Sequence, residues 1–164
     1  MAKKEKGVLT QGTKVWIKHG DEAAPTLTKM DCITGINVGD DSPTEIDDTC
    51  LDETDTATST YGLNKPGEGA IMINTDPKND THMTLLQLAE DYETVEVFVG
   101  WSDGTAEPTL GVSQLVELPE TRTWTSFVAQ LKAGAPTFDA DSLVNHSVAM
   151  KRQSRAITAF RTVV

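Results

Sequence analysis

Apolar and polar positions alternate through most of this chain, a pattern that predicts a protein built mainly of β-strands. The clearest alternation is in Thr94–Trp101, where Val95, Val97 and Val99 share one face. Less regular strands are expected at 13–19, 30–38, 69–74, 110–118, 121–131 and 143–152, with a last strand or arm at 156–164. Roughly six to eight strands are therefore expected, separated by turns rich in glycine, proline and aspartate.

One stretch has helical periodicity instead. Four residues fall at i, i+3, i+4 and i+7 and form one apolar stripe: Leu85, Leu88, Ala89 and Tyr92. Asp80 is a good N-cap for this helix, and Asp76-Pro77 is an alternative start. Many strands with a single helix predict a mainly β fold, either a β-sandwich or a partly closed barrel, with one flanking α-helix.

The pattern also divides the chain into a core and its appendages. Residues 1–11 are expected to form an N-terminal arm, residues 12–153 a single β-sandwich domain, and residues 154–164 a C-terminal strand or arm. Inside the domain, residues 39–65 consist mostly of Asp, Glu, Thr and Ser. A segment this polar does not bury itself, and long connections are usually functional or disordered. We expect a projecting acidic loop or long hairpin that gains order from a partner.

The distribution of charged residues along the chain is more informative than the net charge. The net charge of −11 disfavours tight binding of nucleic acid. The segment from Met30 to Glu120 carries 20 acidic and two basic residues, whereas the remainder carries five acidic and 12 basic ones. An acidic body with basic ends is typical of head-to-tail self-association. The alternative is an acidic solubilising surface with mobile basic tails.

Targeting signals and cysteine chemistry add little. No apolar run is long enough for a membrane helix, and no apolar segment follows the basic start, so a protein that stays soluble in the cytoplasm is expected. Cys32 and Cys50 are not at metal-binding spacing, and we interpret them as two free, partly buried thiols, with a disulfide between them as the alternative.

Catalytic and cofactor motifs are absent from the sequence. It has no P-loop, dinucleotide fingerprint or nucleophile elbow, and no histidine has a second ligand at metal spacing. Asp47–Asp55 invites a calcium interpretation but lacks the glycine and closing glutamate of an EF-hand loop, so a solvated or partner-facing acidic loop is favoured. The three tryptophans are expected in core or subunit-interface packing. We therefore expect a protein that is not an enzyme and that binds no cofactor and no metal.

Several stretches, taken in order, resemble the major tail tube proteins of lambda-like, long-tailed bacteriophages. They are Gly12–Ile17, the acidic segment Glu45–Asp52, the block Leu85–Tyr92 that leads into Thr94–Trp101, and Asn145–Arg152. The resemblance spans most of the chain from Gly12 to Arg152 and depends on the order and spacing of these stretches.

The resemblance implies a structural subunit of the virion tail, assembled in the host cytoplasm into stacked hexameric rings through which DNA passes. It implies that the acidic loop and both arms reach neighbouring copies, and that a tape-measure protein, a tail-tip initiator and a tail terminator are further partners, with no membrane involved. The residues expected at contacts between subunits or rings are Asp40, Asp41, Glu45, Asp47, Asp48, Asp52, Glu53, Asp55, Lys3, Lys4, Lys6, Lys151, Arg152, Arg155 and Arg161.

Two other functions stay open at this point. One is a tube protein of a contractile or secretion-type system, which would assemble together with a sheath. The other is a binding module that decorates the capsid or adheres to the host surface through exposed Trp and Tyr residues.

Overall fold

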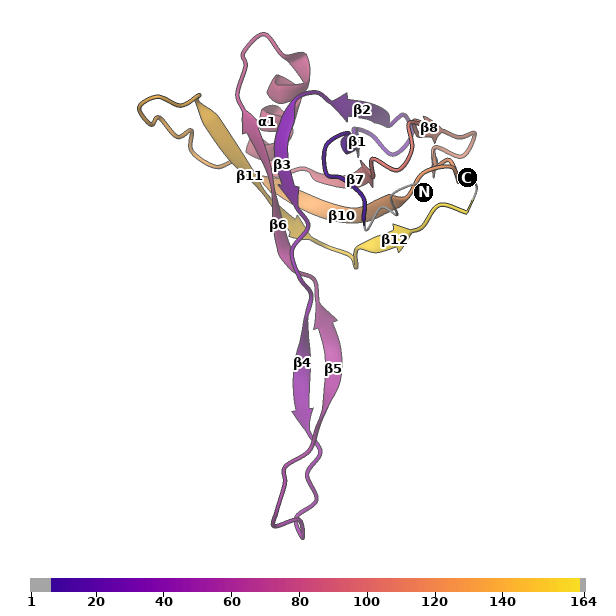
Figure 1. Ribbon diagram of the computed structural model, residues 1–164, viewed down its shortest axis with the longest axis vertical. Helices are drawn as coiled ribbons and strands as arrows, with labels where there is room; N and C mark the ends of the chain where they lie inside the picture. The colour runs from indigo at the N-terminus through magenta and orange to yellow at the C-terminus, as the bar shows by residue number, and fades with distance from the viewer. Residues whose placement is uncertain (1–6, 163–164) are drawn as a thin grey trace, which may run out of the picture.

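A computed structural model describes residues 7–162 as twelve strands and one helix (Figure 1). The strands and helix are β1 (Lys14–His19), β2 (Thr26–Met30), β3 (Ile33–Asn37), β4 (Ser42–Asp47), β5 (Ser59–Lys65), β6 (Glu68–Asn74), α1 (Asp80–Glu90), β7 (Thr94–Gly100), β8 (Thr109–Leu110), β9 (Val116–Glu117), β10 (Trp124–Lys132), β11 (Asn145–Arg152) and β12 (Ile157–Ala159). The predicted mainly β fold with one flanking helix is confirmed.

Eight strands form one antiparallel sheet in the order β2-β1-β7-β10-β11-β6-β3, with β12 paired to β10 beside β11. The other four strands form two separate hairpins, β4–β5 and β8–β9. The strands at the two ends of this order, β2 and β3, are joined by only Asp31 and Cys32. Since so short a link holds both ends together, the sheet has to curl round until they meet. The result is a partly closed barrel.

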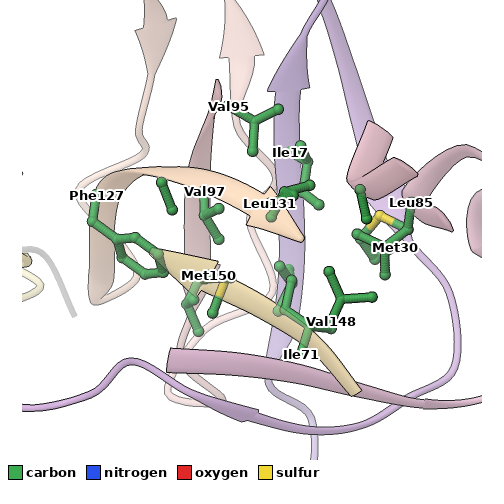
Figure 2. Close-up of a cluster of buried hydrophobic side chains, with 14 of the residues drawn as sticks. Ile17, Met30, Ile71, Leu85, Val95, Val97, Phe127, Leu131, Val148 and Met150 are labelled. Atoms are coloured by element: carbon green, nitrogen blue, oxygen red, sulfur yellow. The ribbon is translucent and has the colours of Figure 1, made fainter. Parts of the chain in front are cut away.

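Buried apolar side chains fill the inside of this curl. Figure 2 shows Ile17, Val97, Leu131 and Val148 converging from four strands of the sheet. The alternation predicted in β7 is confirmed, because Val95, Val97 and Val99 are all buried in this cluster. Burial of such residues is the main favourable term in folding.

Helix α1 closes the barrel beside the β2–β3 link. Its N-cap is Asn79, whose side chain accepts a hydrogen bond from the Thr81 amide, and Asp80 is the first helical residue, so the predicted N-cap was one residue off. Leu85 and Ala89 are buried as predicted. Tyr92 is not part of the stripe: it lies beyond the helix with a φ of 54° and an exposed side chain. The third buried residue of the helix is His82, whose Nε2 atom lies 2.8 Å from the Asp31 carbonyl oxygen.

Two predicted strands are each divided in the structure. The strand expected at 30–38 is the last residue of β2 followed by β3, because Cys32 adopts a φ of 55° and turns the chain. The strand expected at 110–118 is the short hairpin β8–β9. Val116 and Leu118 pack on a second small cluster, made by Trp16, Phe98 and Trp124. Within the described residues no helix is long and apolar enough to cross a membrane.

Candidate assembly surfaces

The segment 39–65 forms a hairpin that extends away from the barrel on a narrow connection (Figure 1). β4 and β5 pair only with each other, and nearly every residue in them is exposed. Four apolar side chains are exposed along this hairpin: Ile46, Leu51, Tyr61 and Leu63. A long exposed strand pair carrying apolar side chains is the kind of surface that associates with another chain.

The acidic residues of the hairpin partly shape its tip. Asp47 accepts the Thr49 amide at 2.9 Å, and Glu53 accepts the Asp55 amide at 2.9 Å. The Thr49 side chain and then its amide lower the pKa of Asp47, and backbone amides, that of Asp55 first, lower the pKa of Glu53. Glu45 accepts the Ser59 hydroxyl across the two strands at 2.5 Å. The tip is therefore a bonded turn with exposed carboxylates.

The remaining acidic residues of segment 39–65 have fewer partners. For Asp40, Asp48 and Asp52 the described part of the chain shows no side-chain hydrogen bond, and Asp55 has only a long one, 3.4 Å, to Thr56. These carboxylates face solvent in the isolated chain. They are therefore available to a basic partner surface.

Close backbone packing sets the direction of the hairpin where it leaves the barrel. A Cβ atom on Gly67 would lie 2.1 Å from the Asp40 carbonyl oxygen, and one on Gly39 would lie 2.2 Å from that of Glu68. Gly39 also has a φ of +81°, which side-chain-bearing residues rarely adopt. Only glycine at these positions lets the two backbone segments pass each other this closely. We call residues 39–41 and 66–68 the neck.

Buried Arg152, the last residue of β11, fastens the neck to the barrel. Its guanidinium donates to the carbonyls of Val38 and Gly39, both at 3.0 Å, and forms an ion pair with Asp41. It also donates to the Ser154 carbonyl at 3.2 Å. Arg152 and Asp41, both expected at contacts between subunits, thus contact each other inside one chain. The hydrogen bond from Arg152 and a second from Asn64 lower the pKa of Asp41.

The other basic candidates differ in position. Lys3, Lys4 and Lys6 lie outside the described residues. Lys151 and Arg155 are exposed near the bend that follows β11. Arg161 contacts Asp103, with its Nε atom 3.9 Å from the carboxylate and its Nη1 atom donating to the Asp103 carbonyl at 2.9 Å.

A second buried arginine, Arg122, holds the opposite end of the barrel. It lies over the rings of Trp16 and Trp124, at 5.4 and 5.3 Å from their centroids. It donates to four carbonyls, those of Gly12, Gly100, Trp101 and Ala106. Burial lowers its pKa, an effect that the charges of Asp103 and Glu107 oppose. Trp16 and Trp124 are core residues, as predicted.

The histidines and cysteines, which could take part in catalysis or bind a metal, either make structural hydrogen bonds or lie far apart from one another. His19 bonds to Thr28 at 2.7 Å, and burial lowers its pKa. His146 bonds to Thr75. Both cysteines are exposed, so the expectation of partial burial was wrong, and they lie at the β2–β3 link and the hairpin tip. Among residues 7–162 no group of three or more His, Cys, Asp or Glu could hold a metal ion.

Sequence reasoning missed both buried arginines and the neck. An arginine that stacks on tryptophans has the same local sequence as a surface arginine, because its partners come from distant strands. The signal that could have indicated the neck is the presence of glycines on both sides of the polar segment, at 39, 67 and 69.

Comparisons with known proteins bear on the family and the fold of this chain. Residues 6–162 match the family described as "Phage tail tube, TTP, lambda-like". The chain is 30% identical over 148 residues to "Structural protein 3" of Pseudomonas phage PAJU2, covering 88% of each protein.

Two solved structures have a similar fold. One is the PVC sheath/tube terminator of an extracellular contractile injection system, with a TM-score of 0.62 and 10% identity, covering 94% of this chain and 98% of that one. The other is the SPP1 tail tube, with a TM-score of 0.58 and 8% identity, covering 96% of this chain and 81% of that one. At such identities the likeness shows the fold alone.

Proposed function

This chain belongs to the lambda-like phage tail tube family and is a structural component of the virion tail; from that premise we propose that its copies form hexameric rings that stack into the conduit for DNA. The observation that carries the proposal is the β4–β5 hairpin. It buries almost nothing against its own barrel, yet the neck and Arg152 hold it in one direction. A hairpin that is held in one direction but does not pack on its own barrel is suited to contact a neighbouring copy.

We propose that the exposed acidic residues of segment 39–65 contact basic surface on a neighbouring subunit or ring. These residues are Asp40, Glu45, Asp47, Asp48, Asp52, Glu53 and Asp55. The basic side of the contact would include the arm lysines together with exposed Lys151 and Arg155. Charge pairing across such a contact speeds encounter and fixes register more than it adds affinity.

The proposed conduit has to pass DNA without holding it. Carboxylates that face the lumen repel phosphates, and the acidic body of this chain, from Met30 to Glu120, supplies a large excess of them. No chemical step is part of this function, so we propose no reaction and no cofactor. The further partners are a tape-measure protein, a tail-tip initiator and a tail terminator.

Electron microscopy of the concentrated protein tests the proposal, and hollow stacked rings are the expected result. Tyr61 in β5 and Tyr92 after α1 are both exposed, which offers a matched pair of variants. Tyr61→Asn should shorten or abolish the tubes, whereas Tyr92→Asn, at a position whose φ suits asparagine, should leave them unchanged. A chain that stays solitary inside intact virions would contradict the proposal.

The fold also occurs in a contractile injection system, so a tube that works inside a sheath is the second candidate. Tubes that form and function in the phage without a sheath decide for the non-contractile tail. Binding to capsid or glycan without any tube would instead point to a decoration or adhesion module.

A further inference from the structure

The N-terminal segment 9–12 and the C-terminal segment 157–162 are held by adjacent residues of the loop that follows β7. Ser102 donates a hydrogen bond from its hydroxyl to the first backbone carbonyl of the N-terminal segment. The next residue, Asp103, forms an ion pair with Arg161, whose Nη1 atom also donates to the Asp103 carbonyl at 2.9 Å. Two successive residues of one loop therefore hold opposite ends of the chain.

A second pair of adjacent residues, immediately before β10, repeats this arrangement. Arg122 donates from Nη2 to the Gly12 carbonyl at 3.3 Å. The Thr123 hydroxyl oxygen accepts the Arg161 amide at 3.1 Å. Arg122 and Thr123 are both buried, with 1% and 2% of their surface exposed. One member of this pair thus contacts the N-terminal segment, and the other contacts the C-terminal segment.

The two pairs are bonded to each other, and we call the four residues Ser102, Asp103, Arg122 and Thr123 the junction. The Asp103 carboxylate accepts the Thr123 amide at 3.1 Å and the Thr123 hydroxyl at 2.5 Å. Arg122 donates from Nε to the Trp101 carbonyl at 2.6 Å. The contacts to the two segments therefore belong to one hydrogen-bonded network.

Close packing leaves the loop of the junction little room to adjust. A Cβ atom on Gly104 would lie 2.7 Å from the Thr121 carbonyl oxygen and 2.9 Å from the Arg122 Cβ atom. A Cβ atom on Gly12 would lie 3.2 Å from that of Ser102. Because a packed structure transmits strain, a shift of the loop on its N-terminal contacts also moves its C-terminal contacts.

Both segments are held by few contacts. Every residue of both is exposed. Outside the junction, the C-terminal segment has the pairing of β12 with β10 and the ring of Phe160, which meets the Trp101 ring edge-on with centroids 6.0 Å apart. Such segments open locally at a free energy well below that of global unfolding. Loss of some junction contacts is therefore enough to favour their release.

We infer that the junction couples the two segments, so that release of either one loosens the hold on the other. Release of the N-terminal segment frees the Ser102 hydroxyl and removes one acceptor of Arg122, which loosens the loop that carries Asp103. The reverse effect is equal in size, because the coupling free energy between two binding events is reciprocal.

This coupling gives the fold a conformational device. A partner that takes up one end of the chain makes the other end easier to take up. The coupling is a property of the isolated chain and goes beyond the tube function, so it can be tested on dilute, unassembled protein.

Hydrogen exchange on the full-length chain tests the coupling from the N-terminal side. Gly12→Ala should push the N-terminal segment away from Ser102, because the added methyl group is close and a φ of +94° disfavours alanine. The amides of Arg161 and Thr162, both hydrogen-bonded in the parent, should then exchange at least about fivefold faster. Ser102→Ala should act in the same direction. Gly7→Ala is the matched control, since nothing lies within 4 Å of its added methyl group.

The C-terminal side is tested by the double variant Phe160→Ala with Arg161→Met. It removes the ring and the guanidinium that contact the loop and touches nothing in the N-terminal segment. Relaxation of ¹⁵N should show lower backbone order parameters at residues 8–12 than in the parent. Exchange in the central strands β7 and β10 should change less, which separates local coupling from a loss of global stability.

An unchanged partner segment in either direction would overturn the coupling. A double variant whose C-terminal segment stays protected would overturn it as well, because the junction contacts would then not hold that segment. A chain that shows the coupling but forms no tubes would contradict the tube function alone.

Discussion

Arg152 at the end of β11 and Asp41 at the base of the hairpin form an ion pair that joins the barrel to its projection. β11, the hairpin and the residues that follow β11 all meet at this pair. The same guanidinium also donates a hydrogen bond to the Ser154 carbonyl. The two parts of the chain that we propose to contact neighbours are therefore fastened at one point.

Substitutions at this pair should be coupled. Asp41→Asn and Arg152→Met should each lower the urea midpoint of unfolding, because each leaves the other group without its partner. The double variant should lose less stability than the two single losses added together. Denaturant titrations of the four proteins measure this coupling. Strictly additive losses would show that the pair does not stabilise the neck.

Acid should weaken both carboxylate contacts. Hydrogen bonds from Arg152 and Asn64 lower the pKa of Asp41. At Asp103 burial raises the pKa, but the hydrogen bonds from Thr123 and the charge of Arg161 together outweigh burial, so the pKa is lowered. Since the folded-state pKa lies below the ordinary value of 3.8, their stabilisation is complete above that pH and is lost as the pH falls through the folded value. Urea midpoints should hold steady from pH 7 to about 5 and decline below about 4. Asp103→Asn should flatten that decline.

The neck should not accept a side chain. Gly67→Ala places a methyl group against the Asp40 carbonyl, which is backbone and cannot rotate away. We expect a loss of about 1–3 kcal/mol, or a hairpin with a changed direction and fewer tubes. Gly7→Ala is the matched control, because nothing lies within 4 Å of its added methyl group. Equal stability of the two variants would refute the close crossing.

Arg122 should be important for stability and Arg155 should not. Arg122→Met leaves four carbonyls without their donor, and a buried polar group without a partner costs about 1–3 kcal/mol. We expect a loss of at least about 3 kcal/mol. The same change at exposed Arg155 should stay within about 0.5 kcal/mol. Thermal unfolding followed by circular dichroism compares the two variants.

Amide exchange should change with assembly in the hairpin above all. In the free chain the amides of β4, β5 and the tip are expected to exchange fast, because so little of the hairpin is buried. In tubes they should become protected, whereas the central strands β7 and β10 should be protected in both forms. Equal protection of the hairpin in the two forms would contradict its role in contacts.

Local pattern was enough to predict the fold class, with a partly closed barrel as one of two alternatives, but not to choose between the barrel and the sandwich. Val95, Val97 and Val99 indicate a half-buried strand by alternation alone. The break at Cys32 was missed because apolar residues flank it on both sides and its left-handed φ leaves no mark in composition. The pairing of β4 with β5 was open as well, since both faces of this hairpin are largely polar and no alternation sets its register.

The candidate contact residues could be selected from the sequence only by their charge. The acidic tip was recognised because it departs from the composition of a core. The inward use of Arg152 was not, since its carbonyl partners at Val38 and Gly39 are more than a hundred residues away in the chain. Long-range contacts of this kind determine which charges are exposed.

The two-residue link between β2 and β3 also has a consequence for synthesis. β1–β2 and β3–β6 can pair early, but the strands that lie between them in the sheet, β7, β10 and β11, are translated later. An incomplete chain therefore has two unjoined halves and no shared interior, and it stays open to proteases. Only a subunit translated through Arg152 can close, so we expect prematurely terminated products to be degraded by proteases instead of joining an assembly.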